Sequence, residues 1–170
     1  MLTDSTKDID AYYHLGLAYY SMKEYNKAFR NFNHVILGNP SYKDTYFRRG
    51  NSFLKLRIYD YAIYDFKKAL ELNPKLIEAY INIGNAYFRK KNHDKAILYY
   101  SHAIAINEKL LYAHYNRGLA YVKQKEYVLA IDEFNRTVEL NEKFKAGIRQ
   151  RSRAHALQRK IKIENNPEKN

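Results

Sequence analysis

The chain has 170 residues, with 30 Lys or Arg and 18 Asp or Glu, and its formal net charge is +12. With 46% hydrophobic and 15% aromatic residues it is not a disordered polyelectrolyte. It contains no Cys, which excludes disulfides and Cys-ligated metal sites. The first ten residues show no secretory signal, and charged residues interrupt every apolar run. We therefore expect a soluble, cytoplasmic protein.

Residues 1–8 form a lead-in, and from residue 9 the sequence repeats every 34 residues without an insertion. The units are 9–42, 43–76, 77–110 and 111–144. Five columns keep this spacing: Gly16, Gly50, Gly84 and Gly118; Tyr19, Phe53, Tyr87 and Tyr121; Ala28, Ala62, Ala96 and Ala130; Phe32, Phe66, Tyr100 and Phe134; Asn39, Asn73, Asn107 and Asn141. Such a period indicates a stack of identical supersecondary units.

Each unit carries two apolar stripes at helical spacing, which predicts a pair of antiparallel helices. In the first unit the stripes are Tyr12, Leu15, Gly16 and Tyr19, then Tyr25, Ala28, Phe32 and Val35. A Gly inside a helix costs about 1 kcal/mol relative to Ala, so we expect Gly16 to allow a close approach to the second helix. The Asn column is expected to end each second helix in the left-handed conformation.

These columns resemble the tetratricopeptide repeat, a 34-residue helix–turn–helix unit with the pattern W-x2-L-G-x2-Y…A-x3-F…P. The resemblance covers residues 9–144 and implies an all-α fold, a right-handed α-solenoid of antiparallel helix pairs with about nine helices. The Trp position holds Tyr12, Tyr46, Tyr80 and His114. The Leu of the L-G pair is replaced by Arg49 and Arg117, whose stems we expect to cover apolar surface while their charged groups reach water.

Residues 145–163 are predicted to form a basic capping helix, because solenoids need a polar terminal cap. Residues 164–170 are predicted to be a disordered tail or linker. The cations of this basic patch are Lys145, Arg149, Arg151, Arg153, Arg159, Lys160 and Lys162. Another row of cations, Lys23, Arg57, Lys91 and Lys125, follows the first helices and is interpreted as favourable placement near helix C-termini.

In the family that the chain resembles, the first helix of each unit lines the inner surface of the solenoid. This face mixes apolar side chains with amides and few charges, as expected of a peptide-binding groove. The candidate groove residues are Tyr13, His14, Tyr20, Phe47, Arg48, Asn51, Ile81, Asn82, Asn85, Phe88, Arg89, Tyr115, Asn116 and Lys123. Among them, Tyr13, Phe47, Ile81 and Tyr115 could equally pack between repeats.

Asn82 and Asn116 share one repeat position, and Asn51 and Asn85 share another. An Asn amide donates and accepts hydrogen bonds at once, so it matches a peptide backbone. Some tetratricopeptide proteins bind a C-terminal carboxylate with two Asn and several cations. Here Asn51 and Asn82 fit, but the cation positions hold Phe47, Tyr112 and Asn116, which disfavours that clamp.

The sequence therefore predicts a non-catalytic scaffold that binds a segment of another protein. The alternative hypothesis is electrostatic binding of nucleic acid, an acidic partner or an anionic surface through the basic C-terminal helix. No His pair has metal-ligand spacing, and no phosphate-binding loop or nucleophile motif occurs. We accordingly expect no enzyme activity, cofactor or metal site.

Overall fold

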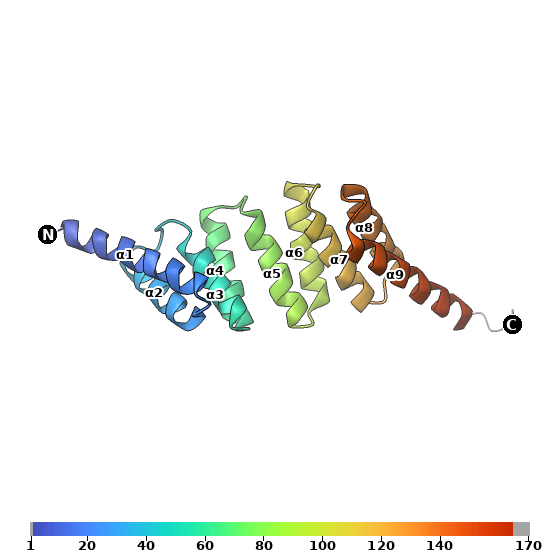
Figure 1. The fold of residues 1–170 in the computed structure, drawn as a ribbon, viewed down its shortest axis with the longest axis horizontal. Helices are drawn as coiled ribbons and strands as arrows, with labels where there is room; N and C mark the ends of the chain where they lie inside the picture. Colours follow the sequence, from blue (N-terminus) through green and yellow to red (C-terminus); the bar gives the residue numbers. More distant parts are fainter. Residues whose placement is uncertain (1, 165–170) are drawn as a thin grey trace. The chain divides into compact units, whose positions relative to one another are not determined.

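The structure is a computed structural model that describes residues 2–164, and residues 165–170 of the predicted tail lie outside the described part. The described chain is all-α, with nine helices and no strand, as predicted (Figure 1). The helices are α1 (Leu2–Ser21), α2 (Tyr25–Gly38), α3 (Thr45–Lys55), α4 (Tyr59–Leu72), α5 (Ile77–Arg89), α6 (His93–Ile106), α7 (Leu111–Lys123), α8 (Tyr127–Leu140) and α9 (Lys145–Glu164).

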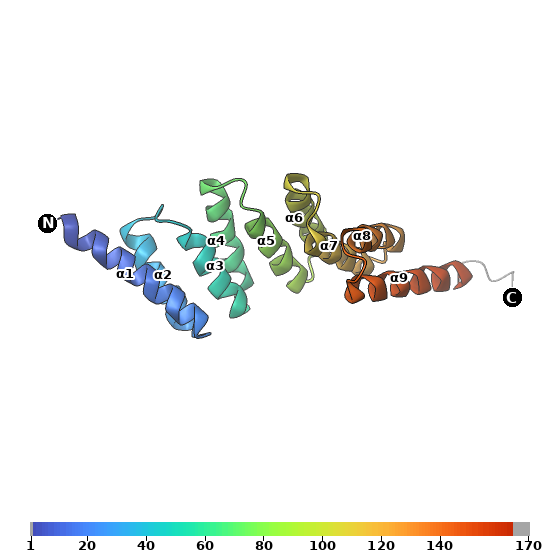
Figure 2. The same cartoon turned by 45° about the horizontal axis from the view of Figure 1, so that its top comes forward.

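The helices group into two compact units, Met1–Lys90 and Lys91–Asn170, here called unit 1 and unit 2. In unit 1 each of the helices α1 to α5 packs against the next one along the chain, and α3 also contacts α1 and α5. In unit 2 the same holds for α6 to α9, and α7 also contacts α9. Figure 2 shows the alternating direction of successive helices within each unit. No helix within residues 2–164 has the length and apolar character that a membrane span requires.

The aromatic column of the second helices forms the centre of each helix pair. Phe32, Phe66, Tyr100 and Phe134 are all buried. The glycine of the first helix leaves room for this ring. A Cβ built on Gly16 would lie 2.6 Å from Cε1 of Phe32, and one on Gly118 would lie 2.7 Å from Cε1 of Phe134. A close approach of first and second helix at these glycines therefore agrees with the sequence prediction.

The Asn column ends the second helices, but not in the predicted left-handed conformation. Asn39 has φ −151° and ψ 98°, and its three equivalents are also extended. Their side chains instead form short local turns, because Oδ1 accepts a hydrogen bond from the backbone N–H two residues later. This bond measures 3.1 Å from Ser41 to Asn39 and 2.9 Å from Lys109 to Asn107. The Asn side chain, rather than a left-handed backbone, forms the turn.

Four left-handed residues stand after the first helices instead, and Lys43, with φ 46°, follows α2. Lys23, Arg57, Lys91 and Lys125 have φ values of 63°, 62°, 61° and 65°. After α1, the N–H of Lys23 binds the carbonyl oxygen of Tyr20 at 3.0 Å, and the N–H of Glu24 binds that of Tyr19 at 2.9 Å. This is a Schellman ending, in which a left-handed residue is usually Gly. Helix polarity, by which the sequence analysis explained these four cations, does not predict that they adopt a left-handed backbone.

Two residues of the first predicted stripe are not core. Tyr12 and Leu15 are 38% and 46% exposed. Their equivalents in α3, Tyr46 and Arg49, lie half-buried where α3 packs against α2. No other helix within residues 2–164 covers α1 in this way, so the Tyr12 ring only stacks on His34, with a centroid separation of 4.7 Å.

Candidate binding surfaces

The first-helix face of unit 1 is the set of candidate groove side chains that α1, α3 and α5 carry. Its members are Tyr13, His14, Tyr20, Phe47, Arg48, Asn51, Ile81, Asn82, Asn85, Phe88 and Arg89. They come from neighbouring helices, because α3 contacts both α1 and α5. The packing of unit 1 therefore places the face of α3 beside those of α1 and α5.

Two amides of this face bind each other. Nδ2 of Asn82 donates to Oδ1 of Asn51 at 2.8 Å, and both residues are half-buried. An Asn amide has two donor hydrogens and a carbonyl acceptor. Within residues 8–164, Nδ2 of Asn51 and Oδ1 of Asn82 have no further hydrogen-bond partner. The pair therefore presents one donor group and one acceptor side by side.

The Tyr13 ring belongs to the core rather than to the surface. It is 6% exposed and packs edge-on against Phe32 and Tyr42. Its hydroxyl donates to Oδ1 of Asp44, whose Oδ2 accepts from Nε of Arg48 at 2.7 Å. Burial, and next the bond to Asp44, raise the pKa of Tyr13. The Tyr13 ring is therefore buried within its own repeat, and its hydroxyl reaches Asp44 of the next repeat, which in turn holds Arg48.

The other large apolar side chains of the face are half-buried. The ring of Phe47 lies 5.7 Å from that of Phe66 in α4, and the ring of Tyr20 lies 5.3 Å from that of Tyr25 in α2. Burial raises the pKa of Tyr20, so its phenol stays neutral. Each ring thus packs partly on the core and retains some exposed surface.

The corresponding face of unit 2 carries Tyr115, Asn116 and Lys123 on α7. The Tyr115 ring packs against Phe134 at 6.0 Å and Phe144 at 5.3 Å between centroids. Asn116 is half-buried and Lys123 is exposed. This arrangement resembles that of unit 1, with an aromatic ring anchored on the second helix beside a polar position.

The two arginines at the Leu position do not extend their charged groups into water, as the sequence analysis expected. Nε and Nη2 of Arg49 donate to the two carboxylate oxygens of Asp65 at 2.8 and 2.7 Å, and Nη1 donates to Asn33 at 2.8 Å. Asp65 is fully buried. Burial raises the pKa of Asp65, and Arg49 opposes this effect. A buried carboxylate requires such a partner, so the expectation for Arg49 was wrong.

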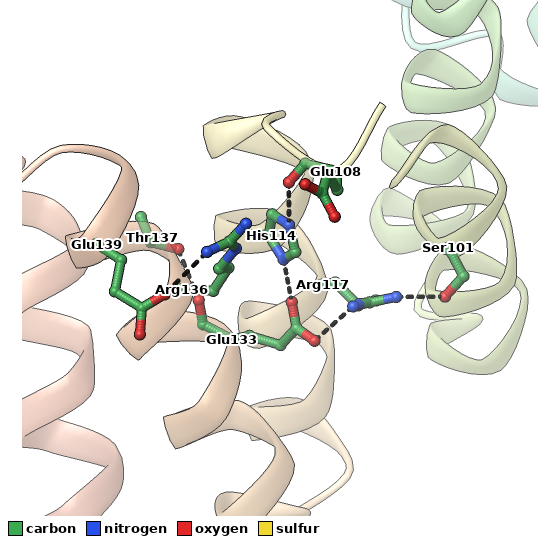
Figure 3. A network of polar contacts seen from close by, with 8 residues as sticks. All are labelled: Ser101, Glu108, His114, Arg117, Glu133, Arg136, Thr137 and Glu139. Carbon is green, nitrogen blue, oxygen red and sulfur yellow. Dashed lines mark hydrogen bonds and ion pairs between the residues drawn. The ribbon is translucent and has the colours of Figure 1, made fainter. Parts of the chain in front are cut away.

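Arg117 occupies the same position in unit 2 and forms a related network (Figure 3). Its Nη2 donates to Oε1 of Glu133 at 2.6 Å, and its Nη1 donates to Ser101 at 2.8 Å. Oε2 of Glu133 lies 2.8 Å from Nδ1 of His114, whose Nε2 lies 2.9 Å from the carbonyl oxygen of Glu108. Burial by itself raises the pKa of Glu133. The hydrogen bonds from His114 and Arg117 lower it by more, so the net shift of this pKa is downward.

These networks were not predicted from the sequence, although the spacing of their residues carries one signal. Arg49 and Asp65, and likewise Arg117 and Glu133, are separated by 16 residues. That interval links equivalent levels of the two helices in a pair. The contacts join the helices of one pair, α3 to α4 and α7 to α8, through carboxylates that are almost completely buried.

A pocket of about 520 Å³ lies among α2, α3 and α4 in unit 1. Its apolar walls come from Phe29, Phe53, Tyr61 and Tyr64, and its polar groups from Asn33, Arg49 and Asp60. None of these residues belongs to the first-helix face. The pocket is therefore separate from the surface that the sequence analysis singled out.

The basic patch lies on α9, which packs on α8 and α7 through Gly147 and Ala154. Arg151 is half-buried and its Nη1 lies 3.4 Å from Oδ1 of Asn135. Lys160 lies 3.8 Å from Glu164. The other cations of the patch, Lys145, Arg149, Arg153, Arg159 and Lys162, are exposed. Among residues 2–164, no group of three His, Asp or Glu side chains could hold a metal ion.

Comparison with known proteins identifies the class of this helical repeat. Tetratricopeptide repeat profiles match residues 9–42, 44–76, 77–110 and 111–144. Together these segments cover most of the chain. The chain therefore belongs to the tetratricopeptide repeat family, as its sequence predicts. No curated protein in the comparison matches its sequence.

Solved structures show the same fold. The crystal structure of MamA is 24% identical with a TM-score of 0.79, and the match covers 96% of this chain and 94% of MamA. The first tetratricopeptide domain of Spaghetti (RPAP3), bound to the HSP90 peptide SRMEEVD, is 24% identical with a TM-score of 0.63, covering 65% and 88%. The Arabidopsis OM64 domain is 23% identical with a TM-score of 0.64, covering 68% and 96%.

Proposed function

We propose that the chain is a non-catalytic scaffold that binds an extended segment of a partner protein on the first-helix face of its repeats. The observation that carries this proposal is the Asn51–Asn82 pair. Its open donor and acceptor match the N–H and carbonyl groups of a peptide backbone. Because both amides are half-buried and held by each other, little side-chain freedom is lost when a ligand binds.

The surroundings of the pair support the same class of ligand. Tyr20, Phe47 and Phe88 are half-buried on the same face, and partly exposed rings anchored on the core supply contact area with little further ordering. The domain of Spaghetti, which shares the fold, is solved with a bound peptide. The cation positions of a carboxylate clamp remain apolar or amide in this chain, so we expect recognition of backbone and apolar side chains rather than of a terminal carboxylate.

The test is selection of peptides from a random 12-residue display library on the intact chain, followed by affinity measurement on variants. Asn51→Ala and Asn82→Ala should each weaken the selected peptides about tenfold, because one hydrogen bond contributes about 0.5–1.5 kcal/mol. The matched control is Asn31→Ala on α2, whose Nδ2 binds only the Lys27 carbonyl at 2.8 Å. The Asn31→Ala variant should bind the selected peptides with the same affinity as the unaltered chain.

Salt dependence separates this function from the electrostatic alternative on α9. Arg153→Glu/Arg159→Glu reverses two exposed cations of the basic patch and should leave peptide affinity unchanged. A steep salt dependence that only this variant abolishes would favour the basic patch. Failure to select any peptide would contradict the proposal. So would Asn51→Ala and Asn82→Ala variants that bind the selected peptides as tightly as the unaltered chain does.

A further inference from the structure

A second surface of unit 1 lies where its first helices end. Figures 1 and 2 show the ends of α1, α3 and α5 along one lower edge of this unit. Lys55 and Arg89 stand in the last turns of α3 and α5, while Lys23 and Arg57 follow α1 and α3 by two residues. We call these four exposed residues the basic turn edge. None of them forms an ion pair with another side chain within residues 8–164.

Two of the four cations occupy a backbone conformation that disfavours them. Lys23 and Arg57 have φ values of 63° and 62°. Glycine adopts this left-handed conformation without steric cost, whereas any side chain with a Cβ is strained there. Strain at a surface turn, in residues whose side chains form no ion pair within residues 8–164, is an outlier for which function is the natural hypothesis.

The polarity of α3 does not account for Arg57. A cation near a helix C-terminus is favoured, but the effect falls off beyond the last turn. Lys55 already provides that charge for α3 without a left-handed backbone. Arg57 adds a second cation at the cost of strain. Unit 2 shows the same arrangement within itself, since Lys123 ends α7 and Lys125 follows with φ 65°.

The edge is also hollowed. A pocket of about 340 Å³ is lined by residues 23–27 and by Leu56, which precedes Arg57. Lys27 is paired with Glu24, so Lys23 is the cation of the pocket wall that remains available. The exposed apolar side chains at the adjoining turns, Met22 and Ile58, are aliphatic.

We propose that the basic turn edge binds an acidic segment of a partner protein, whose carboxylates pair with Lys23, Lys55, Arg57 and Arg89. Charge complementarity favours an anion, and the pocket beside Leu56 accepts an aliphatic side chain between carboxylates. Single-stranded nucleic acid would need exposed rings on which bases stack. The ring of Tyr25 is instead packed against Tyr20, which makes an acidic peptide the better fit. This surface does not depend on the Asn51–Asn82 pair.

The test uses Lys23→Gly/Arg57→Gly, which removes two charges and relieves two strained residues at once. The urea midpoint should rise, while affinity for a fluorescent decaglutamate peptide at 50 mM salt should fall at least fivefold. The salt dependence of binding should become shallower. Because stability and affinity are expected to change in opposite directions, partial unfolding cannot imitate the result.

Two controls complete the experiment. Arg153→Gln/Arg159→Gln removes two exposed cations from α9, and Asn51→Ala alters the first-helix face; both should bind decaglutamate like the unaltered chain. Absent binding, unchanged affinity of the glycine variant, or a loss confined to the α9 variant would overturn the proposal. A ten-residue uridine oligonucleotide that bound more tightly and depended on the same two residues would also overturn it. A lower urea midpoint for the glycine variant would show that Lys23 and Arg57 are not strained, and it would also count against the proposal.

Discussion

Arg49 holds Asp65 by two hydrogen bonds, from Nε and Nη2 to the two carboxylate oxygens, although Asp65 is fully buried. The two residues lie on α3 and α4, so their contact joins the helices of one repeat. The next repeat shows another solution at the same position, because Ile83 replaces Arg49 there and is also fully buried. An aliphatic side chain therefore fits this position in the fold.

The Arg49–Asp65 pair makes a clear prediction for a double-mutant cycle. Arg49→Leu leaves a buried carboxylate without its cation and should lower the free energy of unfolding by about 3–5 kcal/mol. Arg49→Leu/Asp65→Leu should recover stability to within about 1 kcal/mol of the unaltered chain, as replacement of a buried pair by apolar residues often does. Urea denaturation measures both values. A double variant as unstable as the single one would show that the pair itself stabilises the fold.

The Glu133 network predicts a pH dependence of stability. The pKa of Glu133 is lowered in the folded state, so its contribution is complete above the unfolded pKa near 4.3 and is lost as the pH falls through the folded pKa. Glu133→Gln should be about 3 kcal/mol less stable than the unaltered chain at pH 7, because His114 and Arg117 lose their carboxylate. The difference should shrink as the pH falls from about 5 to 3.

Glu139→Gln is the matched control for this prediction. Glu139 lies on the same helix, and its carboxylate, 62% exposed, pairs with Arg136 at 3.0 Å. Exposed pairs of this kind contribute little, so this variant should follow the unaltered chain at every pH. Chemical denaturation at pH 7, 5, 4 and 3 decides the matter. A constant difference for Glu133→Gln across this range would contradict the assigned pKa direction.

Gly118 should tolerate no larger residue, despite its position inside a helix. Gly118→Ala normally would gain about 1 kcal/mol in helix propensity, but the new Cβ would lie 2.7 Å from Cε1 of Phe134. We expect a net loss of about 1–3 kcal/mol, measured by urea denaturation. Gly118→Ala/Phe134→Leu should recover part of the loss, because the smaller side chain withdraws from the added methyl group. A stabilised Gly118→Ala variant would show that the ring moves freely.

The alanine column makes a parallel prediction for the second helices. Ala96 is fully buried in α6, so Ala96→Leu should overpack the helix pair and lower the free energy of unfolding by about 1–3 kcal/mol. Ala105 lies exposed on the same helix, and Ala105→Leu should change stability by less than about 0.5 kcal/mol. Thermal or urea denaturation of the two variants provides the comparison. Equal effects would mean that Ala96 is not enclosed as described.

The candidate binding face could be predicted from repeat spacing only in part. Equivalent positions identify which helix face carries Asn51 and Asn82, but the hydrogen bond between their side chains depends on how α3 and α5 pack. The sequence likewise left open whether Tyr13 packs inside or faces a ligand. Its burial against Phe32 and Tyr42 decides the question, because aromatic side chains suit both roles.

The sequence by itself determined the fold class, the family, the helix pairs and the close contact at the glycines, because period and residue size repeat without interruption. Only the tertiary structure decided which polar groups meet. Arg49, Asp65, His114 and Glu133 lie in helical stripes whose apolar pattern says nothing about charge pairing. Similarly, four left-handed residues fall after the first helices, where no Gly marks them. Such details depend on distances between helices, which a periodic pattern does not encode.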